Sequence, residues 1–281
     1  MDKGKIKKSI ICKYVKDYHI STRHNKTYVP KSGDVAVFKV MELGKHVAVQ
    51  GHHGKHTYIF PGDYVMLAFG NRYATNQFEG YLPKEYQEEY EILGIGGVAG
   101  VVECMHCKMD TLGTTKLKLH GYAMGEDKKV INTTYLHAKP RKFSSRRRKR
   151  NYKVILSIGS GMDSGKTTTA AYLCRGLNND GHKVGFVKLT GTVYSKDKHF
   201  VKDCGAHKVV DFSTVGFPST YMCEKEELLD LYETLLRKVS TIKPDYVVVE
   251  IADGLMQRET KMLLSSGYFR RTIDGVILSG L

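Results

Sequence analysis

The chain has 281 residues and a formal net charge of +15, with 44 Lys and Arg against 29 Asp and Glu. No apolar run reaches the roughly 18 residues of a membrane span, and the stretch from Met1 to Lys5 lacks the apolar centre of a signal peptide. The six cysteines are scattered along the chain, which favours reduced thiols, and we therefore expect a cytoplasmic protein. The length predicts two domains, and the absence of a long apolar run predicts no membrane partner.

The sequence of residues 1–138 predicts a β-rich N-terminal domain. Short apolar runs with β-type composition are separated by Gly, Pro and Asp at spacings of about 10–12 residues, which is typical of a small all-β barrel or sandwich. The polar stretch 83–92 is expected to be helical. The expected strands are residues 34–40, 46–50, 56–60, 64–69, 101–104, 116–122 and 130–132.

Two groups of zinc-ligand residue types occur in this domain. One is a histidine cluster. The other is a CxxC motif formed by Cys104 and Cys107, with His106 between the two cysteines. A structural zinc site needs four ligands, and no second CxxC follows. We expect hairpin histidines exposed to solvent and packed cysteines, with metal binding by Cys104 and Cys107 left open as the alternative. The clustered histidines are His46, His52, His53 and His56.

A basic linker over residues 139–151 separates the two domains. Residues 139–153 contain nine basic residues and no acidic one, so this short segment carries most of the charge imbalance. Self-repulsion favours an extended, solvated segment. A contact with the phosphate backbone of a nucleic acid is the alternative role.

A glycine-rich turn organises the second domain, residues 152–281. The apolar run 154–158 predicts a buried strand, residues 169–177 have helical spacing, and the sequence GSGMDSGKTT at 159–168 lies between them. Strand, glycine-rich turn and helix in this order are typical of the phosphate-binding loop of a nucleoside triphosphatase. The predicted nucleotide contacts are Gly159, Gly161, Asp163, Ser164, Gly165, Lys166, Thr167 and Thr168.

Later residues extend the same pattern. We expect strands at 182–187, 209–211, 246–251 and 272–278, and helices at 224–239 and 257–264. Alternating strands and helices predict an α/β fold in which a parallel sheet lies between two helical layers, with ligands at the carboxyl ends of the strands. No helix follows the last strand. We therefore expect either a chain truncated at its C-terminus, or a partner such as a second copy in a homo-oligomer that covers this strand.

The loop spacing Gly-x5-Gly-Lys-Thr resembles that of dethiobiotin synthetase and the molybdenum-cofactor guanylation helper, which are small P-loop enzymes and helpers. Three other stretches are similar to this group: VKLTG at 187–191, the interval from Asp197 to Gly205-Ala206, and VVVEIADG at 247–254. The resemblance covers about residues 152–281 and implies ATP and Mg²⁺ as cofactors. One departure is that Ile251-Ala252 replaces the glycines that follow the glutamate in the synthetase.

The resemblance implies that Glu250 binds Mg²⁺ beside the Thr167 hydroxyl. We expect Asp197 as a further acidic ligand, with Asp203 and Asp211 as alternatives, and Lys166 and Lys188 as catalytic cations on the transferring phosphoryl group. The segment with Thr190, Thr192 and Tyr194 is expected to line an acceptor pocket, and Asp253 and Arg258 to face the site or flank the next helix.

Three functions are compatible with these residues. The first is ATP-dependent phosphoryl transfer to, or activation of, a small-molecule substrate. The second is a nucleotide-dependent binding or assembly protein, and the third is a nucleic-acid 5′-kinase. We rank them in this order. The sequence contains no base-specific motif that separates ATP from GTP.

Overall fold

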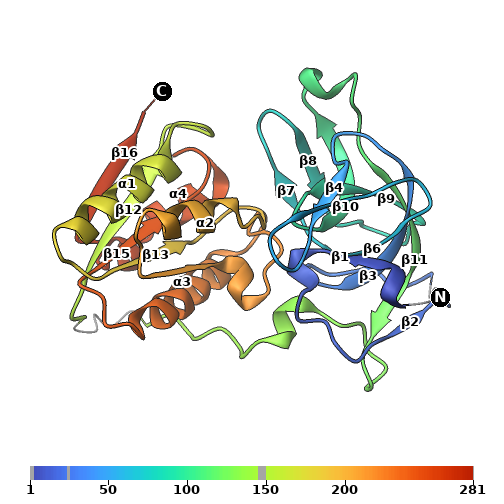
Figure 1. The fold of residues 1–281 in the computed structure, drawn as a ribbon, viewed down its shortest axis with the longest axis horizontal. Coiled ribbons are helices and arrows are strands. Elements are labelled where there is room, and N and C mark those ends of the chain that lie inside the picture. Colours follow the sequence, from blue (N-terminus) through green and yellow to red (C-terminus); the bar gives the residue numbers. More distant parts are fainter. Residues whose placement is uncertain (1–2, 24–25, 145–149, 281) are drawn as a thin grey trace. The chain divides into compact units, whose positions relative to one another are not determined.

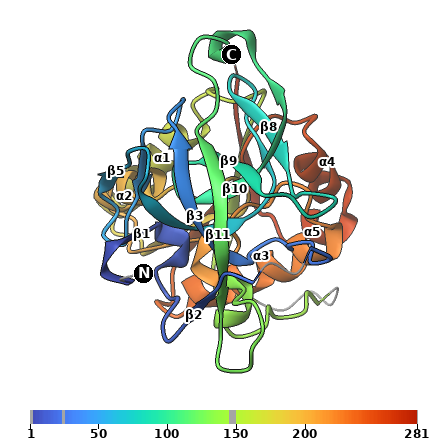
Figure 2. The same ribbon diagram turned by 90° about the vertical axis from the view of Figure 1, so that its right-hand side faces the viewer.

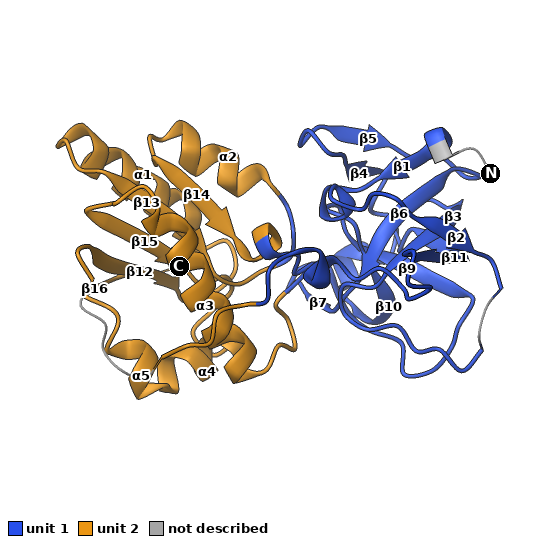
Figure 3. Cartoon of the chain, turned by 90° about the horizontal axis from the view of Figure 1, so that it is seen from below, with its two compact units in different colours: residues 1–139, 192–194, 215–219 blue, residues 140–191, 195–214, 220–281 orange. Residues whose placement is uncertain are grey.

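In the computed structural model, which describes residues 3–23, 26–144 and 150–280, the chain forms two compact units (Figures 1 and 3). Unit 1 contains residues 1–139 together with 192–194 and 215–219. Unit 2 contains residues 140–191, 195–214 and 220–281. Two short stretches from the second half of the sequence therefore belong to unit 1. The expected linker residues 145–149 lie outside the described residues.

In its described residues, unit 1 is built from short strands and four single-turn 3₁₀ helices. The 3₁₀ helices are Lys3–Lys5, Ile10–Cys12, Cys107–Met109 and Thr133–Leu136. The strands are β1 (Ile6–Lys8), β2 (His19–Ser21), β3 (Val35–Glu42), β4 (Ala48–Gln50), β5 (His56–Tyr58), β6 (Tyr64–Phe69), β7 (Arg72–Tyr73), β8 (Phe78–Tyr81), β9 (Glu89–Gly94), β10 (Val98–Met105) and β11 (Lys116–Met124).

Five of these strands close into a barrel. The hydrogen-bonded order runs β6-β3-β11-β9-β10, and a parallel pairing between β10 and β6 joins the two ends of this series. Figure 2 shows β11 between β3 and β9. Phe38, Phe69 and Tyr90 fill the barrel with ring centroids 5.1 to 5.7 Å apart. Of the two expected architectures, the structure therefore has the barrel.

The predicted helix over residues 83–92 is wrong. Residues 89–94 form β9, in which Tyr90 and Ile92 are buried in the barrel core. Glu91, on the other face of the strand from Tyr90 and Ile92, pairs with Lys116 of β11 at 2.8 Å. The alternation of apolar and acidic residues is thus that of a strand with one buried face. The strand predicted at 130–132 is also absent, and only isolated bridges from Val130 and Asn132 occur there.

One of the four clustered histidines and both CxxC cysteines differ from expectation in their burial. His46 is buried, whereas His52, His53 and His56 are exposed as expected. Cys104 and Cys107 are exposed rather than packed. In the described part of the chain, no three His, Cys, Asp or Glu side chains are grouped as ligands for a metal ion.

Among the described residues, unit 2 has a five-stranded sheet and five α-helices, and the 3₁₀ turn Phe212–Val215 begins in unit 2 and ends at the first residue of a unit 1 stretch. The strands are β12 (Lys153–Gly159), β13 (Val184–Lys188), β14 (Lys208–Asp211), β15 (Tyr246–Glu250) and β16 (Gly275–Ser279). The helices are α1 (Lys166–Asn179), α2 (Lys196–Asp203), α3 (Lys225–Ser240), α4 (Arg258–Ser265) and α5 (Gly267–Arg270).

All strands of this sheet are parallel, in the order β14-β13-β15-β12-β16. Helices α1 and α2 cover one face, and α3, α4 and α5 cover the other (Figure 3). Val247, Val248 and Val249 of central strand β15 are fully buried because helices cover both faces there. The predicted α/β fold with a parallel sheet, preceded by a β domain, is confirmed.

The described part of the basic segment is docked on α3 and is not freely solvated, contrary to expectation. The Arg141 amide donates to the Thr234 hydroxyl at 2.6 Å, and the Phe143 amide donates to Asp230 at 2.8 Å. Lys142 pairs with the same carboxylate at 2.8 Å. The acidic side chains of α3 supply the counter-charge that offsets self-repulsion along the segment.

One edge of the sheet in unit 2 is formed by β16, where Val276 and Leu278 are exposed. Coverage of this strand by a partner stays a prediction. Within residues 3–23, 26–144 and 150–280, no helix combines the length and apolar character needed to cross a membrane.

Candidate functional site

The carboxyl ends of three neighbouring strands bring the predicted site residues of unit 2 together. Ser157 on β12, Glu250 on β15 and Lys188 on β13 are in register across the sheet. The glycine-rich loop, residues 159–165, leaves β12 at this edge and enters α1. The site therefore follows from the parallel register, which places Lys188 and Glu250, the last residues of β13 and β15, beside Ser157 near the end of β12.

The glycine-rich loop needs glycine at two positions for different reasons. A Cβ atom on Gly159 would lie 2.2 Å from Ser164 Oγ, so only glycine allows the loop to fold back so closely. Gly165 precedes α1 with a φ of 86°, a left-handed conformation that glycine adopts readily. Asp163 also has a positive φ, of 61°, and is exposed.

Lys166 begins α1 and is mostly buried under this loop. Its ammonium donates to the Gly161 carbonyl and, at 3.3 Å, to the Ser164 hydroxyl. Burial lowers the pKa of Lys166, and the carboxylates of Glu250 and Asp253 offset part of that effect. The lysine cation is thus held directly beneath the loop that the sequence predicts to bind phosphate.

Thr167 and Glu250, both predicted metal ligands, are in contact. The Thr167 hydroxyl donates to Glu250 Oε1 at 2.8 Å. Glu250 is buried, and its second oxygen, Oε2, has no hydrogen-bond partner among the described residues. A buried, unsatisfied carboxylate oxygen is costly, so it marks a place for a ligand. A hydroxyl beside a carboxylate is also the hard oxygen donor set that Mg²⁺ prefers, and these residues fit that ion.

Lys188 joins the same group from β13. Its ammonium lies 3.2 Å from Glu250 Oε1 and also pairs with Asp197. Burial by itself would lower the pKa of Lys188, but the two carboxylates outweigh burial and raise the pKa above its usual value. The lysine is therefore a fixed cation at the site and does not face solvent.

The structure distinguishes the three aspartates that compete for the second acidic role. Asp197, in the first turn of α2, is the one that reaches Lys188. Asp203 is exposed at the far end of the same helix. Asp211 pairs with Lys198 at 3.0 Å and accepts hydrogen bonds from the Thr214 amide and hydroxyl, so it stabilises the turn after β14.

The segment after β15 packs on the glycine-rich loop. A Cβ atom on Gly254 would lie 2.6 Å from the Ser160 carbonyl oxygen, which shows how closely the two backbones approach. The Ala252 amide donates to the Thr190 hydroxyl at 2.8 Å. Thr190 thus ties the segment after β13 to the segment after β15. Thr192 and Tyr194, also expected in an acceptor pocket, belong to unit 1.

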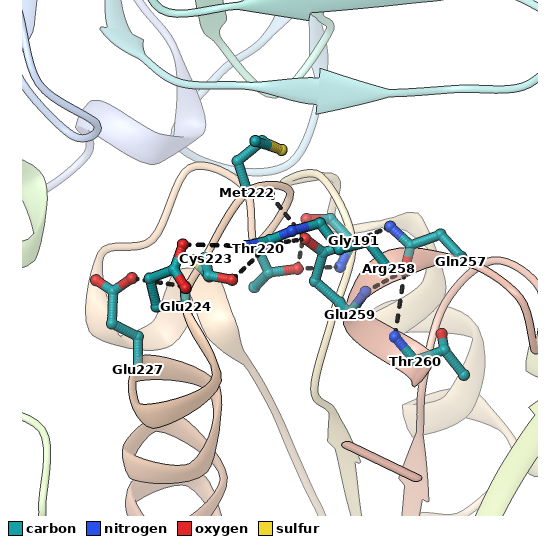
Figure 4. Close-up of polar contacts among 10 residues, drawn as sticks. All are labelled: Gly191, Thr220, Met222, Cys223, Glu224, Glu227, Gln257, Arg258, Glu259 and Thr260. Carbon is teal, nitrogen blue, oxygen red and sulfur yellow. Dashed lines mark hydrogen bonds and ion pairs between the residues drawn. The ribbon is translucent and has the colours of Figure 1, made fainter. Parts of the chain in front are cut away.

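A polar cluster around Glu259 anchors the outer part of this edge (Figure 4). Glu259 is buried and accepts from the Met222 amide at 2.9 Å and from Arg258 at 2.7 Å. Arg258 also donates to the Cys223 carbonyl at 2.7 Å and to Glu224 at 3.0 Å. Arg258 is therefore part of a clamp between α4 and the segment before α3.

Sequence reasoning missed the role of Glu259. The available signal was Gln257 immediately before α4, whose side chain accepts from the Glu259 and Thr260 amides as a helix N-cap. A glutamate in the first turn after such a cap is ordinary for a helix. Only the tertiary contact with Met222 identifies it as an anchor of the site edge.

No family model and no curated protein matches this chain. Among solved structures, the signal recognition particle 54 kDa protein from Aeropyrum pernix K1 in complex with GDP matches with 22% identity and a TM-score of 0.33. That match covers 47% of this chain and 29% of the other. The signal recognition particle receptor FtsY from Elizabethkingia anophelis in complex with GDP matches with 15% identity and a TM-score of 0.34.

The FtsY match covers 53% of this chain and 50% of that chain. The matched region thus spans half or less of either solved chain. These are distant likenesses of fold to nucleotide-bound proteins over about half of this chain. They carry no information on its substrate or activity.

Proposed function

We propose that unit 2 binds a nucleoside triphosphate with Mg²⁺ and transfers its terminal phosphoryl group, with ATP as the nucleotide and a small-molecule acid or hydroxyl as the acceptor. The observation that carries this proposal is the convergence of Thr167, Lys188 and Glu250 beneath the glycine-rich loop. Glu250 Oε2 is buried there without a partner among the described residues.

The loop and Lys166 would bind the phosphates. Amide groups of a glycine-rich turn and of a helix N-terminus are suited to phosphate oxygens. Lys166 stands at the first residue of α1, and its ammonium is held by the Gly161 carbonyl, an interaction that phosphate oxygens would replace. In such sites the lysine reaches the β- and γ-phosphates.

Thr167 and Glu250 would hold the metal, with the Thr167 hydroxyl and Glu250 Oε2 as donors. When bound, Mg²⁺ neutralises charge that develops on the phosphate oxygens. Lys188 supplies a second fixed cation at the same edge, and its two carboxylate partners hold its ammonium in one place. Cations fixed before the reaction stabilise a transferring phosphoryl group at little reorganisation cost.

The choice of ATP and of a small acceptor rests on the resemblance to the dethiobiotin synthetase group. The stretch 187–191 resembles the Lys-Pro-x-x-Ser/Thr-Gly stretch of that group, although Thr190 lies two residues after Lys188 rather than four. The clamp of Arg258 and Glu259 would hold the acceptor side of the site in shape.

The test is nucleotide binding and turnover by the chain and by Lys166→Ala. Calorimetry with ATP and with GTP, each with Mg²⁺, is expected to give binding that Lys166→Ala weakens by about 100-fold, since a charged contact in a dry site contributes about 3 kcal/mol. Lys261→Ala, at an exposed lysine on α4, is the matched control and should bind normally.

Release of ADP would then be followed with and without a metabolite extract or single-stranded RNA. Stimulation by metabolites supports the proposed enzyme. Phosphate transferred to RNA ends would identify the 5′-kinase instead, and faster ADP release with RNA but no phosphate on its ends would favour the nucleotide-dependent binding protein. Failure of the chain to bind either nucleotide, or equal binding by Lys166→Ala, would overturn the proposal.

A further inference from the structure

A polar groove of about 680 Å³ lies in unit 2 at the amino ends of the central strands. Asp245 and Tyr152, which immediately precede β15 and β12, form part of its wall. The glycine-rich loop leaves the opposite, carboxyl end of the same sheet, so the groove is distinct from the nucleotide site. The lining residues come from the basic segment, the second half of α3 and the turn before β15.

Four cationic side chains line this groove: Arg141, Arg150, Arg237 and Lys243. Arg237 and Lys243 are exposed. Arg141, Arg237 and Lys243 form no ion pair with any carboxylate of residues 3–23, 26–144 and 150–280. Three cations in one groove without anionic partners raise the local concentration of anions.

The two acidic residues of the lining are already engaged. Glu233 lies 3.6 Å from the Arg150 guanidinium. Asp245 Oδ2 accepts the Lys183 amide at 2.7 Å. Lys183 is itself exposed beside the groove. The charge that the groove presents to a ligand is therefore positive.

Arg150 is held in a defined position. Its guanidinium lies over the Tyr232 ring, 5.9 Å from the ring centroid, and its side chain is only 19% exposed. The Tyr232 ring and Glu233 hold the guanidinium at the groove, and the planar set of donors of a guanidinium suits phosphate oxygens. Tyr152, half-buried in the lining, offers an aromatic ring nearby.

We propose that this groove binds the phosphodiester backbone of a single-stranded nucleic acid. The four cations are spread over three separate chain segments, which suits a charged polymer that passes along the groove. Backbone phosphates paired with cations, together with an aromatic ring for base stacking, are the features of single-strand binding sites. The proposal is independent of the proposed phosphoryl transfer, because it uses no residue of the nucleotide site.

The test is the salt dependence of binding to a fluorescent 20-nucleotide single-stranded RNA, measured by anisotropy with the full chain. Counterion release gives a slope of log affinity against log salt of about −0.7 for each phosphate contact on a single strand. The double variant Arg237→Gln/Lys243→Asn should therefore flatten the slope by about 1.4 and weaken binding about 20-fold at 0.1 M salt. Asn suits residue 243 because φ there is 50°.

The matched control is Arg175→Gln, which removes one exposed helical arginine from α1 outside the groove. It should leave both slope and affinity within twofold of the unmodified chain. Circular dichroism of both variants checks that they are folded. RNA binding is measured without nucleotide, so that it is followed separately from the proposed enzyme activity.

Binding measurements with two further ligands identify the chemical group that the groove recognises. Single-stranded DNA of the same sequence should bind if the phosphodiester backbone is what is recognised, and a ribose requirement would appear as a preference for RNA. A poly-glutamate peptide should bind at least tenfold more weakly. The proposal is overturned if the peptide binds as tightly as RNA, if the double variant keeps the full slope, or if the chain binds no single strand.

Discussion

The Thr167 hydroxyl donates to Glu250 Oε1 at 2.8 Å, while Glu250 Oε2 is buried without a partner among the described residues. Because Lys188 contacts the same Oε1 atom at 3.2 Å, one oxygen of the carboxylate is held by two donors and the other is available to a ligand. The carboxylate is thus fixed in orientation by the residues of two neighbouring elements, α1 and β13.

Glu250→Gln should reduce Mg²⁺-dependent turnover by at least about 100-fold, because the amide removes the anionic oxygen that a hard cation prefers. Nucleotide binding measured in EDTA should persist, since no carboxylate then faces the phosphates. Glu226→Gln on the exposed face of α3 is the control. Normal metal-dependent turnover by Glu250→Gln would exclude Glu250 as the metal ligand.

Asp197→Asn should lower the turnover number by about 10-fold and leave the nucleotide KM within about threefold, because misplacing a catalytic cation mainly raises the barrier of the chemical step. Of its two carboxylate partners in the described structure, Lys188 would keep Glu250. Asp203→Asn, at the exposed C-terminal end of the same helix, should have no effect. A large rise in KM with unchanged turnover would instead assign Asp197 to nucleotide binding.

Gly159→Ala should destabilise unit 2 by about 1–3 kcal/mol, the usual cost of overpacking. The new Cβ would lie 2.2 Å from Ser164 Oγ and 2.9 Å from the Ser279 carbonyl oxygen. Gly176→Ala meets no atom within 4 Å in α1 and should stabilise by about 0.5–1 kcal/mol. Urea denaturation of both variants measures the difference, and equal stability would show that the loop relaxes freely.

His46 should make the stability of the protein depend on pH below about 6.5. Burial, assisted by the charges of Arg72 and Lys45, lowers the pKa of His46 to about 3. The unfolded state therefore binds a proton that the folded state does not, so stability contributed by neutral His46 is present above pH 6.5 and is lost progressively as pH falls toward about 3.

Replacing His46 with leucine should flatten this dependence between pH 4.5 and 7. Calorimetric Tm values at several pH values, compared between the chain and His46→Leu, provide the measurement. The exposed His52→Leu is the matched control and should keep the original pH dependence. An unchanged slope in His46→Leu would mean that other groups dominate acid destabilisation.

Much of the fold of unit 2 could be predicted from the sequence because its strands are uninterrupted apolar runs. The apolar run at residues 246–251, for example, predicts a buried strand, and β15 spans Tyr246–Glu250. Prediction failed at residues 83–92. The polar, acidic composition of that stretch suggested a helix. In the structure, Tyr90 and Ile92, which are two positions apart on one face of a strand, pack in the barrel core.

The types of residue in the site could be predicted from the sequence. The contacts between their side chains were harder to predict. Sequence placed Lys188 and Glu250 at strand ends, which parallel register brings to one edge. It could not choose among the three aspartates. That choice depends on the direction of α2, which presents Asp197 to Lys188. The clamp of Arg258 with Cys223 and Glu224 joins residues more than 30 positions apart, beyond the range of local pattern.

The sequence by itself determined the glycine-rich turn, the alternation of strands and helices, and the concentration of positive charge in residues 139–153, because each is a property of neighbouring residues. Only the tertiary structure decided that the β domain closes into a barrel, that one oxygen of Glu250 has no partner among the described residues, and that Arg141 and Arg150 meet Arg237 and Lys243 in one groove. Those outcomes depend on which distant segments pack together, and packing is set by the burial of whole elements rather than by local pattern.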